Sequence, residues 1–442
     1  MKNYSLKIKM AFSVASLAFL LFLGACSSDE PMLTQSEALP AVKSSIRSVE
    51  DACDIAIAFL SADTETPQSR SIADIENVKV GYSNNSRNSA DTLFYSVNLS
   101  NAGGFVLVSA PKSAEPVLAY VEAGSYDPAE TSDNPGFNLF IEKSKEYINY
   151  ASAFGITLPG DGDIEPIMKP YTIVRSADPK LRVKWGQSYP EGLYCPNGLS
   201  GCVQTAMAQI FSYFEEPKSI ELTYPGHDIG RVELNWSEIK KHLTSCNNDF
   251  FSLREHLESC EATDESHKAL AYLCRELGYR NNAQYLTWEK DGVLGTSAYS
   301  ETANSLYKKL LPSRSVTAFS SFGSSCFDNL ILTMKSNKAV AHFRGSDISG
   351  DGGHAWVCEG GRHYEYHTQA ILLNGKEDVR NTYYFYFNWG WDGDYNGYFL
   401  GGVYDKSQGI QESEIPDPKN PLYPRSRSRS DYSKDVYYYM IY

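Results

Sequence analysis

The chain has 442 residues, a length that predicts two or three folding units. Its composition, with 42% hydrophobic and 21% charged residues, is that of a globular protein. Its formal net charge of −14 argues against nucleic acid or an anionic membrane surface as the main partner, because both require clustered lysine and arginine. After the first 26 residues, no stretch is long and apolar enough to predict a membrane-spanning helix.

Residues 1–25 are predicted to be a lipoprotein signal peptide. A basic start precedes an apolar run from about Met10 to Leu23, and small residues follow, which is typical of a secretory signal. The ending Leu23-Gly24-Ala25-Cys26 resembles a bacterial lipobox, which implies cleavage before Cys26 and a diacylglycerol on its sulfur. The alternative is an ordinary signal peptide in which Cys26 has no special role. Residues 26–45 then form a polar tether to the outer membrane or cell surface.

Residues 46–175 are predicted to form a small α+β domain and a linker. The expected elements are a helix at 49–60, a hairpin of strands at 92–99 and 104–109, a strand at 117–120 and a helix at 138–153. Residues 70–88 are polar and interrupted, and 159–179 have the glycine, aspartate and proline content of a linker. No residue of this domain suggests catalysis.

Residues 176–442 are predicted to form a second domain in which helices precede strands. The helices are expected at 237–256, 265–277, 300–311 and 327–337, and the strands at 339–344, 354–359, 382–388, 397–400 and 436–442. Helices first and an antiparallel sheet afterwards is an α+β pattern.

Cys202 stands between a glycine-containing loop and a helical pattern of apolar residues from Val203 to Phe214. A cysteine at a helix N-terminus meets the positive end of the helix dipole and unpaired N–H groups, which lower a thiol pKa. Its own N–H is also positioned to bind an oxyanion. The alternative is a buried structural cysteine.

His354 begins a predicted strand directly after Gly350-Asp351-Gly352-Gly353. Glycines let a substrate backbone approach a histidine closely, and a histidine far downstream of a candidate cysteine suits a papain-like arrangement. Asn388 and Trp389 are candidates to orient that base, although tryptophans and glycines also fit simple core packing. Gln187, before the cysteine helix, is a candidate oxyanion donor.

These segments together resemble the streptopain family of papain-like cysteine peptidases. The matching pieces are Trp185-Gly186-Gln187, the run from Gly201 to Gln209, Gly352-Gly353-His354-Ala355 and Asn388-Trp389-Gly390-Trp391, with Gly103 to Ala110 resembling the family's propeptide. The resemblance implies an α+β papain-like peptidase domain, preceded by a small α+β inhibitory propeptide, and endopeptidase activity in a protein made as a zymogen.

By position, the resemblance implies Cys202 as nucleophile, His354 as base and Gln187 as the oxyanion glutamine. It implies that Gly353 touches the substrate backbone and that Ser297 lies near a substrate-contacting serine. Papain has a longer spacing after its asparagine than the directly adjacent Asn388 and Trp389. We therefore expect a Cys–His dyad steadied by Trp389, with Asn388 nearby.

The expected partners are protein or peptide substrates, the chain's own propeptide as inhibitor and a membrane reached through Cys26. Maturation is expected after Lys169, Arg175 or Lys180. No metal or organic cofactor is expected, because the cysteine spacings contain no CxxC pair. A catalytically silent surface lipoprotein that binds peptides or glycans is the main alternative, and amidase or acyl-transfer chemistry is another.

Overall fold

The computed structural model describes most of the chain beyond the tether. The described residues are 45–62, 74–83, 91–153, 171–246, 250–287, 290, 292, 294–298, 300–346, 353–371, 377–405, 416–417, 420–424 and 436–442. All of them belong to one compact unit, Ser44–Tyr442. The predictions for the signal peptide and for Cys26 lie outside them. Within these ranges no helix combines the length and the apolar character needed to cross a bilayer.

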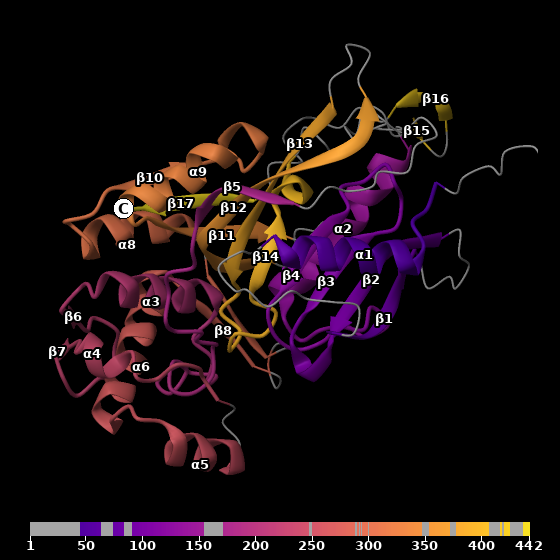
Figure 1. The fold of residues 1–442 in the computed structure, drawn as a ribbon. Coiled ribbons are helices and arrows are strands. Elements are labelled where there is room, and N and C mark those ends of the chain that lie inside the picture. Colours follow the sequence, from indigo (N-terminus) through magenta and orange to yellow (C-terminus); the bar gives the residue numbers. More distant parts are fainter. Residues whose placement is uncertain are drawn as a thin grey trace, which may run out of the picture. The chain divides into compact units, whose positions relative to one another are not determined.

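An antiparallel sheet of 11 strands runs through this unit in the order β1-β2-β3-β4-β14-β13-β12-β11-β17-β10, with β5 added to β12 (Figure 1). Its strands are β1 (Ile75–Tyr82), β2 (Thr92–Leu99), β3 (Phe105–Ser109), β4 (Val117–Val121), β5 (Thr172–Ala177), β10 (Val316–Phe319), β11 (Val340–Ser346), β12 (Gly353–Ile371), β13 (Glu377–Asn388), β14 (Gly397–Leu400) and β17 (Tyr437–Ile441). Short two-stranded pairs are formed by β6 (Ser219–Glu221) with β7 (Arg231–Glu233), β8 (Gln284–Leu286) with β9 (Gly295–Ser297), and β15 (Pro416–Asp417) with β16 (Asn420–Pro424).

The helices have apolar faces, and some of them cover this sheet. They are α1 (Val49–Ser61), α2 (Pro135–Ala153), α3 (Cys202–Phe214), α4 (Trp236–Ile239), α5 (Phe250–Ser259), α6 (Asp264–Arg280), α8 (Ser300–Leu310) and α9 (Ser324–Asn337), with 3-10 turns η3 (Ser100–Ala102) and η4 (Gly401–Tyr404). Helices α3, α6 and α8 contribute to a second cluster of buried apolar residues. Helices packed with an antiparallel sheet confirm the predicted α+β class.

The N-terminal part forms as its pattern predicts. Helix α1 starts in a capping box in which Ser48 and Asp51 bond each other's backbone, and its buried stripe packs on β2 and β3. Strands β2 and β3 pair as the expected hairpin. Strand β1, at the end of the sheet, lies in the stretch with no expected element, because polar residues on both sides obscure the short alternation of Val78, Val80 and Tyr82.

Strand pairing joins the segment before residue 175 to the segment after it. Strand β4 pairs with β14, matching Ala119 with Phe399. Strand β5 lies in the stretch predicted to be a linker and pairs with β12, matching Ser176 with Arg362. The sheet is therefore continuous across the two predicted domains.

One predicted helix, 237–256, is wrong. Among the described residues of this range, only those of α4 and α5 are helical, and the backbone of Leu243 and Cys246 bonds to Lys184 and Tyr189 instead. These long-range hydrogen bonds override the local helical preference. The non-helical stretch places His242 and Ser245 against the loop that precedes Cys202, where they contact Glu191 and Gly186.

Candidate active site

Cys202 is the first residue of α3, whose helix packs between α6 and β12. Gly201 before it has a φ of 92°, and a Cβ there would lie 2.8 Å from Cγ2 of Thr296, so the turn requires glycine. Burial raises the pKa of the Cys202 thiol, and the backbone N–H groups of Ala355, Val203 and Cys202 oppose that rise. In this state desolvation outweighs the pKa-lowering effect expected from the helix N-terminus.

His354 is the second residue of β12 and lies among aromatic rings. Its Nε2 is 2.7 Å from the carbonyl oxygen of Trp389, so Nε2 carries the proton and donates it. Trp356 stacks parallel to the imidazole at 6.3 Å, and Trp391 meets it edge-on at 6.3 Å. Burial lowers the pKa of His354 to about 4, so the ring is neutral and its Nδ1 is left unprotonated.

Helix α2 of the N-terminal part covers His354. A Cβ on Gly136 would lie 2.6 Å from Cδ2 of His354 and 2.5 Å from Cε3 of Trp389, so only a glycine allows this approach. The docking is reinforced where Phe137 stacks on Tyr395 at 4.2 Å and Asn134 donates to the Asp394 carbonyl over 3.0 Å. In the described contacts, Cys202 and His354 share no hydrogen bond. The N-terminal part therefore occupies the position of a lid over the base.

Gln187 lies on a loop that is tied to the start of α3. Its carbonyl oxygen accepts the Ser200 N–H over 2.9 Å, and the Thr205 hydroxyl donates to the Gly186 carbonyl over 3.1 Å. The Gly186 N–H in turn bonds Ser245 Oγ over 2.7 Å. These bonds fix the backbone of Gln187 beside the loop that leads to Cys202.

The two predicted substrate-binding residues, Gly353 and Ser297, are both exposed and lie on strands next to the candidate catalytic residues. Gly353 is exposed at the first position of β12, and Ser297 is exposed at the end of β9. Strand β9 is held to the Cys202 loop by Thr296 Oγ1, which donates to the Leu199 carbonyl over 2.9 Å.

Asn388 and Trp389 follow one another but have different contacts. The buried Asn388 amide donates to the Val183 carbonyl over 3.1 Å, and its Oδ1 accepts the Gly390 N–H over 3.2 Å, so Asn388 shapes the turn. The carbonyl of Trp389 is what meets the histidine. Sequence reasoning missed Gly136 and Trp356 as contacts of His354. The flanking Trp356 was visible in the motif, whereas no local signal marks Gly136.

Two family models match this chain in separate segments. Residues 185–399 match the peptidase C10 family, and residues 43–148 match the Spi protease inhibitor. The first segment contains Cys202, His354 and Trp389, and the second contains Gly136.

Curated proteins similar to the chain include one named as a thiol protease and one named streptopain. Thiol protease/hemagglutinin PrtT of Porphyromonas gingivalis is 25% identical over 405 residues, which is 78% of this chain but 41% of that protein. Streptopain of Streptococcus pyogenes is 24% identical over 382 residues, which is 80% of this chain and 84% of that protein. The chain thus spans less than half the length of PrtT and most of the length of streptopain.

Among solved structures, a fragment of prointerpain A of Prevotella intermedia is 17% identical, with a TM-score of 0.48 and coverage of 83% of this chain and 98% of that one. The segment matches and the relatives lead to one conclusion: residues 185–399 form a peptidase C10 segment, similar to streptopain, and residues 43–148 form a Spi-type protease inhibitor segment.

Proposed function

We propose that this protein is an endopeptidase in which Cys202 is the nucleophile and His354 the base. The observation that carries the proposal is the junction between α3 and β12. Helix α3 packs on β12, and the backbone N–H of Ala355, the residue directly after the histidine, opposes the rise that burial causes in the pKa of the Cys202 thiol, so the start of β12 lies beside the nucleophile. Helix α3 supplies N–H groups at the same point.

The chemistry follows from these groups. His354, held by its Nε2–H on the Trp389 carbonyl, accepts the thiol proton at Nδ1. The thiolate attacks the peptide carbonyl, and the Cys202 N–H with the Gln187 amide stabilises the oxyanion. His354 then protonates the departing amine, which leaves an acyl group on sulfur. Water, activated by the same ring, releases the acid and returns the thiol.

Gly353 and Ser297 fit a substrate-binding role. Both are exposed, and each lies on a strand held against the cysteine or histidine segment. An exposed glycine at a strand start lets an extended peptide approach without a side-chain obstruction. Asn388 acts indirectly, through the turn that presents Trp389.

Latency is assigned to α2. Gly136 lies on the imidazole, and in this covered state the described contacts include no hydrogen bond between His354 and Cys202. Removing residues before β5 would free the ring. Of the three expected cleavage points, Lys169 is favoured. Arg175 is held in β5 by pairing and by Asp328 at 2.6 Å, and the Lys180 N–H bonds Glu359.

The protein is further proposed to be an exported lipoprotein anchored through Cys26. Support comes from the Leu23-Gly24-Ala25-Cys26 ending and the polar residues after it. Incorporation of labelled fatty acid into the full-length chain, lost in Cys26→Ala and kept in Cys53→Ala, is the expected result. If Cys26→Ala incorporated as much fatty acid as the wild type, Cys26 would not be the lipid anchor, and the signal peptide would be an ordinary one.

The proposed activity is tested by mass spectrometry of the precursor after incubation with a thiol reductant. Wild-type protein should release a fragment that ends between residues 153 and 182, whereas Cys202→Ala and His354→Ala stay whole. Cys326→Ala, which changes a half-buried cysteine in α9, is the control and should process normally.

An epoxide inhibitor directed at thiols should label Cys202 in the processed protein. An unprocessed, unlabelled wild type would instead favour the silent peptide- or glycan-binding lipoprotein. Product that forms only when an amine acceptor is present would favour acyl transfer over hydrolysis.

A further inference from the structure

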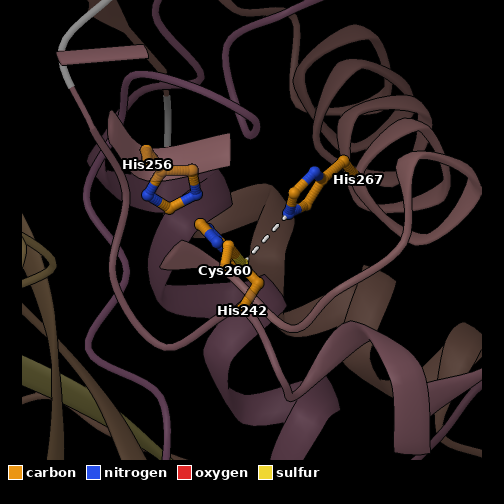
Figure 2. Close-up of side chains that lie close together, drawn as sticks. All are labelled: His242, His256, Cys260 and His267. Carbon is orange, nitrogen blue, oxygen red and sulfur yellow. Dashed lines mark hydrogen bonds between the residues drawn. The ribbon is translucent and has the colours of Figure 1, made fainter. Parts of the chain in front are cut away.

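Three histidines and one cysteine gather in the helical part of the peptidase segment, away from the reacting groups. His242 comes from the non-helical stretch after α4, His256 and Cys260 from the end of α5, and His267 from the first turns of α6. One ligand atom from each lies within 4.8 Å of all the others. Figure 2 shows the four side chains converging, with Cys260 and His242 between the rings of His256 and His267.

Their spacing suits a tetrahedral metal. Cys260 Sγ and His267 Nε2 are 3.6 Å apart. A tetrahedral zinc ion with Zn–N near 2.05 Å and Zn–S near 2.3 Å separates its nitrogen and sulfur ligands by about 3.6 Å. The ligand atoms all lie within 4.8 Å of one another, so no separation exceeds such an edge by more than about 1.2 Å, a change within reach of side-chain torsions.

Two ring nitrogens of the cluster are buried without a partner. Nδ1 of His242 and Nε2 of His256 have no hydrogen bond, and His242 is 0% exposed. A buried nitrogen left unpaired costs about 1–3 kcal/mol, so two of them in one place call for a ligand. Burial lowers the pKa of His242 to about 3 and that of His267 to about 4, and the neutral ring is the form that binds metals.

The other nitrogens are already oriented by a second layer of groups. Nε2 of His242 is 3.1 Å from the carboxylate of Glu191, and Nδ1 of His267 is 3.3 Å from the Tyr189 hydroxyl. A carboxylate behind a histidine is the usual support of a metal-bound imidazole.

We propose that His242, His256, Cys260 and His267 bind one zinc ion in this protein. Three imidazoles and a thiolate form a closed tetrahedral set, and this mixture of nitrogen and sulfur favours zinc over magnesium or calcium, which prefer oxygen. With four protein ligands no position is left open for substrate, so the role is structural. The cluster was not expected from the cysteine spacings because three of its four ligands are histidines.

The position of the site gives the metal a task in the proposed peptidase. Tyr189 and Glu191, which contact the ligands, follow Gln187 on the same loop. Glu191 also accepts the Ser245 hydroxyl over 2.7 Å, and Ser245 holds the Gly186 N–H. The zinc ion therefore braces the loop that presents Gln187, and it ties that loop to α5 and α6. This last step rests on the proposed role of Gln187, whereas the metal site itself does not.

The experiment measures metal in the full-length chain carrying Cys202→Ala, which removes self-cleavage and a competing thiolate. Protein purified in a reductant without chelators should contain about one zinc per chain by elemental analysis. Cys260→Ala and His256→Ala, both at half-buried positions, should lower that content about tenfold. Cys326→Ala and His227→Gln, which change a cysteine and a histidine outside the cluster, should keep it.

Cobalt substitution tests the same metal site independently of how well a variant folds. Cobalt exchanged into the Cys202→Ala protein should give a near-ultraviolet sulfur-to-cobalt band that Cys260→Ala lacks and Cys326→Ala retains. Chelation should lower the melting temperature, and added zinc should restore it. Wild-type protein that neither contains nor takes up zinc, or a Cys260→Ala variant that binds as much as Cys326→Ala, would overturn the site. A zinc-containing protein without peptidase activity would refute the proposed function and leave the metal site standing.

Discussion

The contact between Gly136 and the imidazole of His354 can be tested by a single substitution, Gly136→Val. Any Cβ at this position would lie 2.5 Å from Trp389 and 2.6 Å from His354, so the helix, the ring or both must move. Overpacking of this kind costs about 1–3 kcal/mol, and valine returns roughly 0.4 kcal/mol through its better helix propensity than glycine. The docked position of α2 should therefore lose roughly 0.5–2.5 kcal/mol, which is a shift of about 2- to 70-fold toward an uncovered His354.

The assay is the first-order rate of self-processing of purified precursor, followed by mass spectrometry at several dilutions. Gly136→Val should process faster than wild type by the factor above. Gly230→Val is the matched control, because a Cβ at Gly230 meets no atom within 4 Å. If the two variants process at the same rate, or if Gly136→Val is slower while remaining folded, the lid does not restrain His354 as argued.

Three further predictions concern Gln187, Glu359 and Arg47. Gln187→Ala in processed enzyme should lower kcat/KM for a fluorogenic peptide by about 100- to 1000-fold, chiefly through kcat, and an unchanged kcat would remove Gln187 from the oxyanion site. Burial raises the pKa of Glu359 to about 7, so the folded state binds this proton more tightly than the unfolded state, and stability from it is lost as pH rises through 7. Glu359→Gln should reduce the fall in unfolding free energy between pH 5 and 8 by roughly 2–3 kcal/mol, and identical urea midpoints at both pH values in the two proteins would contradict this. Arg47 donates from a buried position to the carbonyls of Ser109, Pro111 and Ala114, so Arg47→Met should destabilise the precursor by at least about 2 kcal/mol in urea unfolding, whereas a loss under 0.5 kcal/mol would not fit.

Much of the fold was predictable because its elements have strong periodicity. Helices α1 and α6 carry continuous apolar stripes, and β2 and β14 have the limits that their patterns predict. The failures have physical causes. Strand β1 pairs with β2 and packs its apolar residues Ile75, Val78 and Val80 on the core, but polar residues flank them in the sequence. Strand β5 lies in a segment whose prolines and glycines indicate a linker.

The site was predictable only where reactive residues carry local signals. Cys202 follows a glycine that its turn requires, and His354 follows glycines at a strand start. Gly136 reaches His354 from a helix in another segment, and no neighbour in the sequence marks it. The histidine cluster is similar, since each histidine alone has an ordinary context and only the irregular path from α4 to α6 brings the four ligands together.

The pairing of β4 with β14 has a consequence for the processed enzyme. When the segment that contains β1–β4 departs, β14 becomes an unprotected edge whose backbone N–H and C=O groups face open solvent. Tyr398 and Phe399, now buried, lie on that edge. An edge of this kind recruits other extended chains, so the docked inhibitor segment also guards the precursor against aggregation, and the processed enzyme gains a surface on which another strand can add by backbone pairing.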